Sequence, residues 1–281
     1  MLFEELETLL ELSRQGSMGK TAGQLYVSQS AVSKRIANLE RRLGRPLIEP
    51  SGRKIELTAH AHRLLDRLEP ALGQLKGVLF DETEQAQDSP MILACSETLV
   101  AGLVAPALAE YYRRDPWLRV ATYHTPVIAS RVQSGEAALG LCAGYLGEIS
   151  GVSVECLAME PFWLVSPSRL CEKPRALITN DLSNPANRYQ AGVLQQHGIE
   201  PLMQLDSYTA SAELALAGVA PALVPQSIVR ALQIDAQHCH EFGFLEQLKR
   251  PISLCYRHAA LQRDRVRQLA QTIRDVVQSA V

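Results

Sequence analysis

The 281-residue chain lacks any long apolar run. No stretch approaches the roughly 20 consecutive apolar residues that a membrane-spanning helix requires. The N-terminal segment also differs from a secretory signal, because Glu4, Glu5, Glu7 and Glu11 replace the expected basic region and apolar core. We therefore expect a soluble, cytoplasmic protein that has no membrane partner.

Patterns that carry enzymatic, redox or metal chemistry are missing too. The sequence contains no nucleophile elbow, no phosphate-binding glycine loop and no HExxH. Its six cysteines form no CxxC pair, and Cys95, Cys142 and Cys255 lie in apolar segments typical of buried strands. The adjacent side chains of His238-Cys239-His240 point in different directions, with no fourth ligand evident. We expect no enzyme, no metal and no cofactor, and no pattern indicates a redox-sensing thiol.

Charge is distributed unevenly along the chain. Residues 12–65 carry ten Lys and Arg against three Asp and Glu, whereas residues 66–281 carry eighteen against twenty-three. The net charge of −2 therefore hides a basic N-terminal part and an acidic remainder. This is the distribution expected when only one end of a protein meets phosphates. The length allows about two domains, each with its own core.

Two helices separated by a tight turn are predicted near the N-terminus. The first has Ala22 and Leu25 on its apolar face. The second repeats the helical spacing through Ala31, Val32, Ile36, Leu39 and Leu43. Ser28 is a favourable N-cap for the second helix, and Gly44 with Pro46 is a typical stop signal.

Polar side chains follow the turn and open the second helix. Gln29, Ser30, Ser33 and Lys34 lie on its outward face, and all can hydrogen-bond base edges or phosphates. A helix that presents donors at its N-terminal end is how a helix–turn–helix contacts the major groove. We predict that these residues bind DNA together with Ser17 and Ser28, which begin the two helices.

A basic turn follows the second helix. Residues 49–54 lie between two short apolar segments, and Ser51-Gly52 at the tip is typical of a hairpin. Arg53 and Lys54 are therefore predicted at the edge of a two-stranded wing, facing a phosphate backbone or a minor groove. The alternative is a solvated basic turn, which applies to Lys54 above all.

Residues 1 to about 65 resemble the winged DNA-binding domain of LysR-type transcriptional regulators. The matching residues are Gly16-Ser17, Ala22, Leu25, Val27-Ser28-Gln29, Ala31-Val32-Ser33, Ile36, Leu39-Glu40, Leu43-Gly44, Pro46-Leu47 and Leu57-Thr58, and Arg53 matches the family's wing arginine. The chain departs from the family pattern at Met18, Ser30, Ile48, Pro50 and His60. Ser30 and Pro50 are the departures closest to DNA, so they affect the sequence preference.

A long helix is predicted after Thr58, from Ala59 to Gln85. Its apolar stripe comprises Leu64, Leu65, Leu68, Leu72, Leu75, Val78 and Leu79. So long a stripe has no core partner in a small N-terminal domain, and the resemblance implies packing against a second copy in a homodimer or homotetramer. The alternative is that the helix folds back on its own domain. Pro70 and Gly73 predict a bend, and residues 85–90 a hinge.

The remaining sequence alternates strands and helices. Strands at 91–95, 119–124 and 138–142 enclose helices at 99–114 and 127–134, which is typical of a mostly parallel sheet. The element order resembles the regulatory domain of the same family, which is similar to a periplasmic binding protein. The predicted fold is therefore α/β with an N-terminal all-α winged helix–turn–helix domain. Its boundaries are 1–58 for the DNA-binding domain, 59–90 for the linker helix and hinge, and 91–281 for a two-lobed domain with lobe I at 91–159 and 253–281 and lobe II at 160–252.

Small ligands bind such two-lobed bodies where strands end and helices begin. Ser96 and Thr98 follow the first strand, Thr125 follows the second, and Thr179 with Asn180 ends a strand of lobe II. The resemblance implies an effector at this place, although Ser96 also fits the role of a helix cap. Glu97 argues against a strongly anionic effector unless a cation from the other lobe offsets it.

These features predict a regulator that binds double-stranded promoter DNA and responds to a small-molecule effector. RNA polymerase is a further partner that the resemblance implies. One alternative is a DNA-binding regulator whose body serves only assembly. Another is a solute-binding or enzymatic α/β body fused to a DNA-binding head. A polar, roomy cleft favours an effector, whereas a collapsed apolar cleft favours assembly alone.

Overall fold

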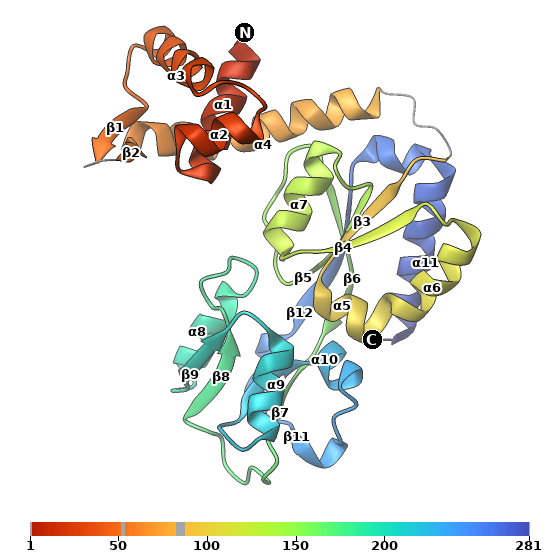
Figure 1. Ribbon diagram of the computed structural model, residues 1–281. Helices are drawn as coiled ribbons and strands as arrows, with labels where there is room; N and C mark the ends of the chain where they lie inside the picture. Colours follow the sequence, from red (N-terminus) through yellow and green to blue (C-terminus); the bar gives the residue numbers. More distant parts are fainter. Residues whose placement is uncertain (1, 52–53, 83–87, 281) are drawn as a thin grey trace. The chain divides into compact units, whose positions relative to one another are not determined.

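The computed structural model describes residues 2–51, 54–82 and 88–280, and for Lys54 it describes the backbone only. The chain forms two compact units, Met1–Gly73 and Gln74–Val281. Their elements are labelled in Figure 1, and each unit is described by itself. Arg53 lies outside the described residues.

Short helices and a two-stranded wing form the first unit. Its elements are α1 (Leu2–Gln15), α2 (Met18–Gln24), α3 (Gln29–Leu43), β1 (Ile48–Ser51), β2 (Lys54–Leu57) and the first part of α4 (Ala59–Asp81). The predicted caps are confirmed: Ser28 Oγ accepts from the Ala31 N–H at 3.2 Å, and Gly44 ends α3 with a φ of +67°. Thr58 Oγ1 likewise accepts from the Ala61 N–H at 3.1 Å and caps α4.

The first half of α4 completes the core of this unit. The buried apolar residues are Leu9, Leu10, Leu12, Ile36, Leu39, Leu47, Ala61, Leu65 and Leu72. The expectation that the apolar stripe has no core partner in the N-terminal domain is therefore wrong for the first half of α4. The short helices α1–α3 enclose a core only together with this half. Leu75, Val78 and Leu79 remain exposed. Helix α4 continues through Pro70 and ends at Asp81, earlier than predicted.

Two five-stranded sheets form the second unit. The first has the order β4-β3-β5-β12-β6 and comprises β3 (Met91–Cys95), β4 (Leu118–Thr122), β5 (Leu139–Ala143), β6 (Ser153–Glu160) and β12 (Arg250–Tyr256). Strands β4, β3 and β5 are parallel, and β12 runs antiparallel to both β5 and β6. Successive residues of β3 face opposite sides, so Leu93 and Cys95 enter one core while Ala94 enters another.

Helices cover both faces of this first sheet. They are α5 (Glu97–Leu99), the π-helical turn η1 (Val100–Val104), α6 (Ala105–Arg114), α7 (Thr125–Ser134), the 3₁₀ turn η4 (His258–Gln262) and α11 (Asp264–Ala280). Figure 1 shows α6 and α11 together on one side of the sheet and α7 on the other. The three cysteines predicted to be buried, Cys95, Cys142 and Cys255, are confirmed as such.

The second sheet has the order β11-β7-β10-β8-β9. Its strands are β7 (Phe162–Val165), β8 (Ala176–Asn180), β9 (Glu200–Leu205), β10 (Ala222–Pro225) and β11 (Cys239–His240). It packs with α8 (Arg188–Gln196), α9 (Tyr208–Leu216), α10 (Gln226–Ala231) and the 3₁₀ turn η3 (Gly243–Leu248), and the 3₁₀ turn η2 (Ala236–His238) directly precedes β11. Below, lobe I and lobe II denote the parts built on the first and second sheets.

The chain passes between the lobes at two adjacent strand ends. Strand β6 ends at Glu160 and is followed by β7, while β12 begins at Arg250 after η3. Glu160 and Arg250 are paired in the ladder of the first sheet. Residues 160 and 250–252 are thus part of the lobe I sheet.

The predicted single helix from Leu99 to Arg114 is interrupted by the π-helical turn. Gly102 lies within this turn, and a Cβ there would overlap the carbonyl oxygen of Ser227, the second residue of α10. The close approach of α10 therefore requires a residue without a side chain. π-Helical turns of this kind accommodate local packing that a regular helix does not.

The last turns of α4 belong to the second unit and pack on lobe I. Arg257 donates to both carboxylate oxygens of Asp81, from Nε at 3.0 Å and from Nη2 at 2.9 Å. The ring of Phe80 lies under this guanidinium and against Gly135, which follows α7. A Cβ at Gly77 would overlap the carbonyl oxygen of Gln133 in α7, so glycine permits this contact as well.

We expect Gly102→Ala to lower the free energy of unfolding of the second unit by about 1–3 kcal/mol, because the new methyl group meets backbone atoms that have no room to retreat. Urea denaturation followed by tryptophan fluorescence measures this, since Trp117 and Trp163 both lie in this unit. The matched control is Gly192→Ala in α8, where a Cβ meets nothing within 4 Å and helix propensity predicts a gain of about 0.5–1 kcal/mol. Equal stability of the two variants would contradict the packing described at Gly102.

Candidate functional site

The polar residues predicted to bind DNA lie together at the start of α3. Gln29, Ser30, Ser33 and Lys34 are exposed on its first turns. Ser28 is exposed as well, and its Oγ lies 2.9 Å from Ser30 Oγ. These side chains form one surface of donors and acceptors that the other described residues of the first unit leave exposed.

Ser17 and Ser28 have a structural role in addition to any contact with DNA. Ser17 is half-buried, and its hydroxyl accepts from the Lys20 N–H at 3.3 Å as the cap of α2. Arg35, although basic and on α3, turns inward and donates to Glu4 Oε2 at 3.2 Å. Lys34 is therefore the basic residue on the first turns of α3 that points outward.

The turn between α2 and α3 carries a residue that the sequence reasoning did not single out. Tyr26 has a φ of +53° and a side chain that is 96% exposed. A left-handed, fully exposed tyrosine at this turn is unusual for a bulky residue. In the sequence, only the position of Tyr26 between the two predicted helices could have indicated that it is exposed at the turn.

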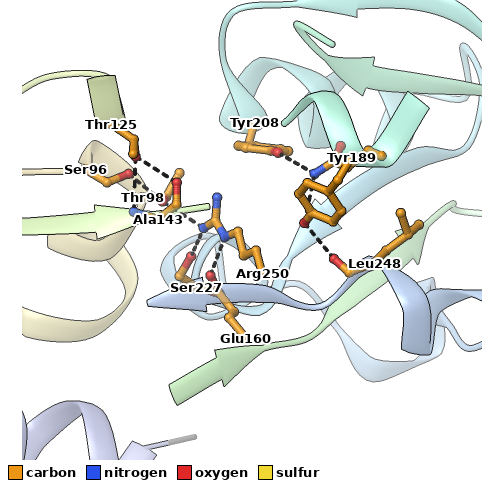
Figure 2. A network of polar contacts seen from close by, with 11 residues as sticks. Ser96, Thr98, Thr125, Ala143, Glu160, Tyr189, Tyr208, Ser227, Leu248 and Arg250 are labelled. Carbon is orange, nitrogen blue, oxygen red and sulfur yellow. Dashed lines mark hydrogen bonds and ion pairs between the residues drawn. The ribbon is translucent and has the colours of Figure 1, made fainter. Parts of the chain in front are cut away.

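The second unit contains a cavity of about 430 Å³ between lobe I and lobe II. Its lining residues are Ser96, Glu97, Thr98, Thr122, Tyr123, His124, Thr125, Val127, Ala143, Asn180, Asn184, Ala186, Asn187, Asp206, Ser207, Tyr208 and Arg250. Four of the five residues predicted to contact an effector, Ser96, Thr98, Thr125 and Asn180, lie in this lining. Figure 2 shows the polar network beside it.

Ser96 and Thr98 present hydroxyls to the cavity from lobe I. Their Oγ atoms lie 3.2 Å apart, and Thr98 Oγ1 also accepts from Arg250 Nη2 at 3.0 Å. Ser96 is the N-cap residue of α5, but its side chain makes no capping hydrogen bond. The capping role considered from the sequence is therefore absent, which leaves the Ser96 hydroxyl accessible to a ligand.

Thr125 lines the cavity with a hydroxyl that is already bonded. It lies in the first turn of α7 instead of at a strand end, because β4 stops at Thr122. Its Oγ1 donates to the Ala143 carbonyl at 2.8 Å and accepts from the Ala143 N–H at 3.3 Å. Thr125 thus joins α7 to the end of β5, and its proton is not available to a ligand.

Thr179 and Asn180 end β8 but face different surroundings. Thr179 is completely buried and does not line the cavity, and its Oγ1 has no hydrogen-bond partner among the described residues. Asn180 lines the cavity, and its Oδ1 accepts from Asn187 Nδ2 at 2.9 Å. The structure therefore separates the two neighbours, and only Asn180 can meet a ligand in this cavity.

Arg250 forms the floor of the cavity and was not predicted. Its side chain is 3% exposed, and its Nε donates to Glu160 Oε2 at 2.6 Å. Nη2 reaches Thr98 Oγ1 in lobe I and Ser227 Oγ on α10, the latter at 3.4 Å. Burial alone would lower the pKa of Arg250, but the Glu160 carboxylate and nearby Tyr208 raise it, so the guanidinium is held charged.

Aromatic residues of lobe II surround the Arg250 guanidinium. The rings of Phe162 and Tyr208 have their centroids 5.5 and 5.3 Å from its central carbon. Gln190 Nε2 donates to Tyr208 Oη at 3.4 Å, and Tyr189 Oη donates to the Leu248 carbonyl at 2.8 Å. Burial raises the pKa of Tyr208, so this phenol is neutral and able to hydrogen-bond.

Charged side chains lie around the rest of the cavity. Glu97 of lobe I and Asp206 of lobe II are exposed carboxylates, and Asp206 Oδ1 lies 3.5 Å from His124 Nε2. His124 precedes α7, so this contact joins the two lobes across the cavity. We call Glu97, His124 and Asp206 the cavity mouth.

Helix α7 runs from this cavity to the end of α4. His124 and Thr125 line the cavity at its N-terminal end. At its other end, the Val132 carbonyl accepts from Arg257, which holds Asp81 of α4, and Gln133 contacts Gly77. Helix α7, a single short element, thus contacts both the cavity and the last turns of α4.

Other candidate sites are absent from the part of the chain that the structure describes. In residues 2–51, 54–82 and 88–280, no group of three metal-ligating side chains comes together. No helix within these ranges has the length and apolarity to cross a membrane.

Comparison with known families agrees with both units. Residues 3–62 match the family model described as "Bacterial regulatory helix-turn-helix protein, lysR family", and residues 86–278 match the "LysR substrate binding domain". A protein of Vibrio cholerae serotype O1, described as an uncharacterized HTH-type transcriptional regulator, is 48% identical over 281 residues, which is 100% of this chain and 98% of the relative. CitR of Bacillus subtilis, an HTH-type transcriptional regulator, is 31% identical over 59% of this chain and 58% of its own.

Solved structures show the same fold. A full-length OxyR variant from Pseudomonas aeruginosa aligns with a TM-score of 0.62 at 17% identity, covering 99% of this chain and 94% of that one. The LysR-family transcriptional regulator CbnR aligns with a TM-score of 0.58 at 20% identity, covering 99% of both chains. With a helix–turn–helix head and a two-lobed body that each match a LysR model, this chain belongs to the LysR family of DNA-binding transcriptional regulators.

Proposed function

We propose that this regulator changes its DNA binding when a small-molecule effector enters the cavity between lobes I and II. The observation that carries the proposal is the cavity itself, about 430 Å³ in volume and lined by polar side chains of both lobes. A volume in this range suits a small ligand. A body that served only assembly would not need an open polar cleft, and a family of transcriptional regulators is expected to bind the effector without catalysis.

The contacts of α7 supply a route from the cavity to α4. A ligand that binds two arrangements of the lobes with different affinity shifts the balance between them. Because α7 begins at the cavity and ends against Gly77 and Arg257, a shift of this helix is transmitted to the last turns of α4. This route requires no new contact, because α7 and α4 already touch at Gly77 and through Arg257.

The exposed apolar residues of α4 support a homodimer. Leu75, Val78 and Leu79 follow helical spacing and leave one apolar face uncovered in the single chain. We propose that a second copy of the same helix covers this face, which would place two heads on two DNA half-sites. A homotetramer and a contact with RNA polymerase stay predictions.

We expect Gln29→Ala to weaken the free energy of DNA binding by about 1–3 kcal/mol through the loss of one base contact. The preference for one base at that position of the DNA should be relaxed. Lys34→Ala should instead weaken binding to specific and random duplexes alike. It should also reduce the slope of the logarithm of the binding constant against the logarithm of the salt concentration by about one. Fluorescence anisotropy with the DNA upstream of the protein's own gene and with a random duplex, across a salt series, measures both. If Gln29→Ala weakens both duplexes by the same factor, Gln29 only positions the helix.

The double variant Leu75→Asp/Leu79→Asp should dissociate the dimer and lose high-affinity DNA binding, because it would bury unpaired carboxylates at the proposed interface. Sedimentation velocity measures the mass. Leu202→Asp, which introduces the same change at an exposed leucine of β9, is the control and should leave the mass unchanged. An intact dimer in the double variant would place the interface elsewhere.

Ser96→Ala should weaken the response to an effector on the order of tenfold, since one hydrogen bond to the ligand is lost. Thr179→Val is the matched control. It removes a buried hydroxyl that lies outside the cavity and has no hydrogen-bond partner among the described residues, so the response to the effector should remain and the free energy of unfolding should not fall. Thermal shift and DNA footprinting across a metabolite panel give the readout. A metabolite that alters DNA binding equally in wild type and Ser96→Ala would sink the assignment of Ser96.

A further inference from the structure

The floor of the cavity holds hydrogen-bond donors that are not bonded to any residue in the described part of the chain. Arg250 commits Nε to Glu160 and Nη2 to Thr98 and Ser227. Its Nη1 has no hydrogen-bond partner among the described residues, and Arg250 lines the cavity. Figure 2 shows the nitrogen without a dashed line pointing away from Glu160 and Ser227, toward the space between Ala143 and Tyr208.

A second unused donor comes from Asn180. Its Oδ1 is taken by Asn187, which fixes the amide so that Nδ2 has no acceptor in the described part of the chain. The side chain is nine-tenths buried and lines the same cavity. Arg250 and Asn180 therefore offer a cation and an amide donor to a ligand atom that accepts hydrogen bonds, and a carboxylate is the acceptor that arginine binds most strongly.

The mouth has the opposite character. Glu97 and Asp206 bring carboxylates from the two lobes, and the remaining titratable group there is His124. Among the described residues the lining contains no lysine, and the charge of its one arginine, Arg250, is balanced by Glu160. A ligand with two or more negative charges would meet repulsion at the mouth, whereas a simple amine would leave the donors of the floor unbonded.

We propose that the cavity binds an amino acid, with the carboxylate on Arg250 and Asn180 and the ammonium group toward Glu97 and Asp206. A molecule with both groups satisfies the floor donors and the mouth carboxylates at once. This inference rests on the proposed function, because it names the chemical class of effector for the same cavity.

The first experiment varies the ligand. The full chain is tested by thermal shift with each proteinogenic L-amino acid at millimolar concentration, and for every amino acid that acts, with its decarboxylated amine and its deaminated acid. One or more amino acids should raise the melting temperature, and each half-molecule should bind more weakly on the order of tenfold, because it loses one charge-assisted contact.

The second experiment varies the protein at each end of the cavity. Asn180→Asp keeps the acceptor for Asn187 but replaces the free donor by a carboxylate oxygen, so it should weaken amino-acid binding on the order of tenfold or more. Asp206→Asn removes a mouth charge from a side chain that is 74% exposed, so folding should survive. It should bring the affinity for the deaminated acid closer to that for the amino acid. Glu213→Gln is the control, an exposed acid of α9 outside the cavity lining.

The outcomes separate this inference from the proposed function. A dicarboxylate, a sugar or an amine that stabilises the protein and loses its effect in Ser96→Ala, with no amino acid acting, would overturn the amino-acid assignment and leave the effector cavity in place. Failure of every amino acid in the panel also overturns it. An amino acid whose binding is unchanged in both Asn180→Asp and Asp206→Asn would show that it binds elsewhere on the chain.

Discussion

The buried ion pair between Arg250 and Glu160 lies at the base of the cavity, and both residues also contact Ser227 of lobe II. The two residues lie on the strand ends where the chain passes between the sheets, and both are almost completely buried. Removing one partner of such a pair leaves a buried charge uncompensated, at a cost of about 3–5 kcal/mol. Because the same guanidinium also contacts Thr98 and Ser227, the floor of the cavity is fixed in both lobes. At the mouth, by contrast, His124 and Asp206 form only an exposed contact, which contributes little to stability.

If an effector binds in this cavity as proposed, the difference between floor and mouth determines how it can act. Opening about a fixed floor changes the distance between lobes most at the mouth, where α7 begins. Helix α7 is packed on the sheet through Ile128 and Val132, so it moves as part of lobe I. At its far end it meets α4 through Gly77 and Gln133, without side chains between the backbones. Such a direct contact transmits small displacements that flexible side chains would absorb.

Local features of the structure could be predicted from the sequence, and long-range ones could not. The caps at Ser28, Gly44 and Thr58 follow from residues a few positions apart, and so does the exposed polar start of α3. Arg250 and Thr98 are 152 residues apart, and no local pattern marks their contact. The turn at Gly102 depends on α10, which comes more than a hundred residues later. Thr179 and Asn180 show the limit most clearly: adjacent strand residues face opposite sides, so an uncertainty of one position decides which side chain lines the cavity.

The division of α4 between the two units affects how the body can be isolated. The family match begins at residue 86 and the first strand at Met91, so either residue would be a natural place to start a truncated body. Such a fragment would lack Asp81 and Phe80, and Arg257 would keep its buried guanidinium without the carboxylate that pairs with it. Gly135 and the guanidinium groups of Arg257 and Arg263 would also lose the ring of Phe80 that lies against them. We therefore expect a fragment of the second unit that begins at Gln74 to be more stable than one that begins at residue 86 or Met91.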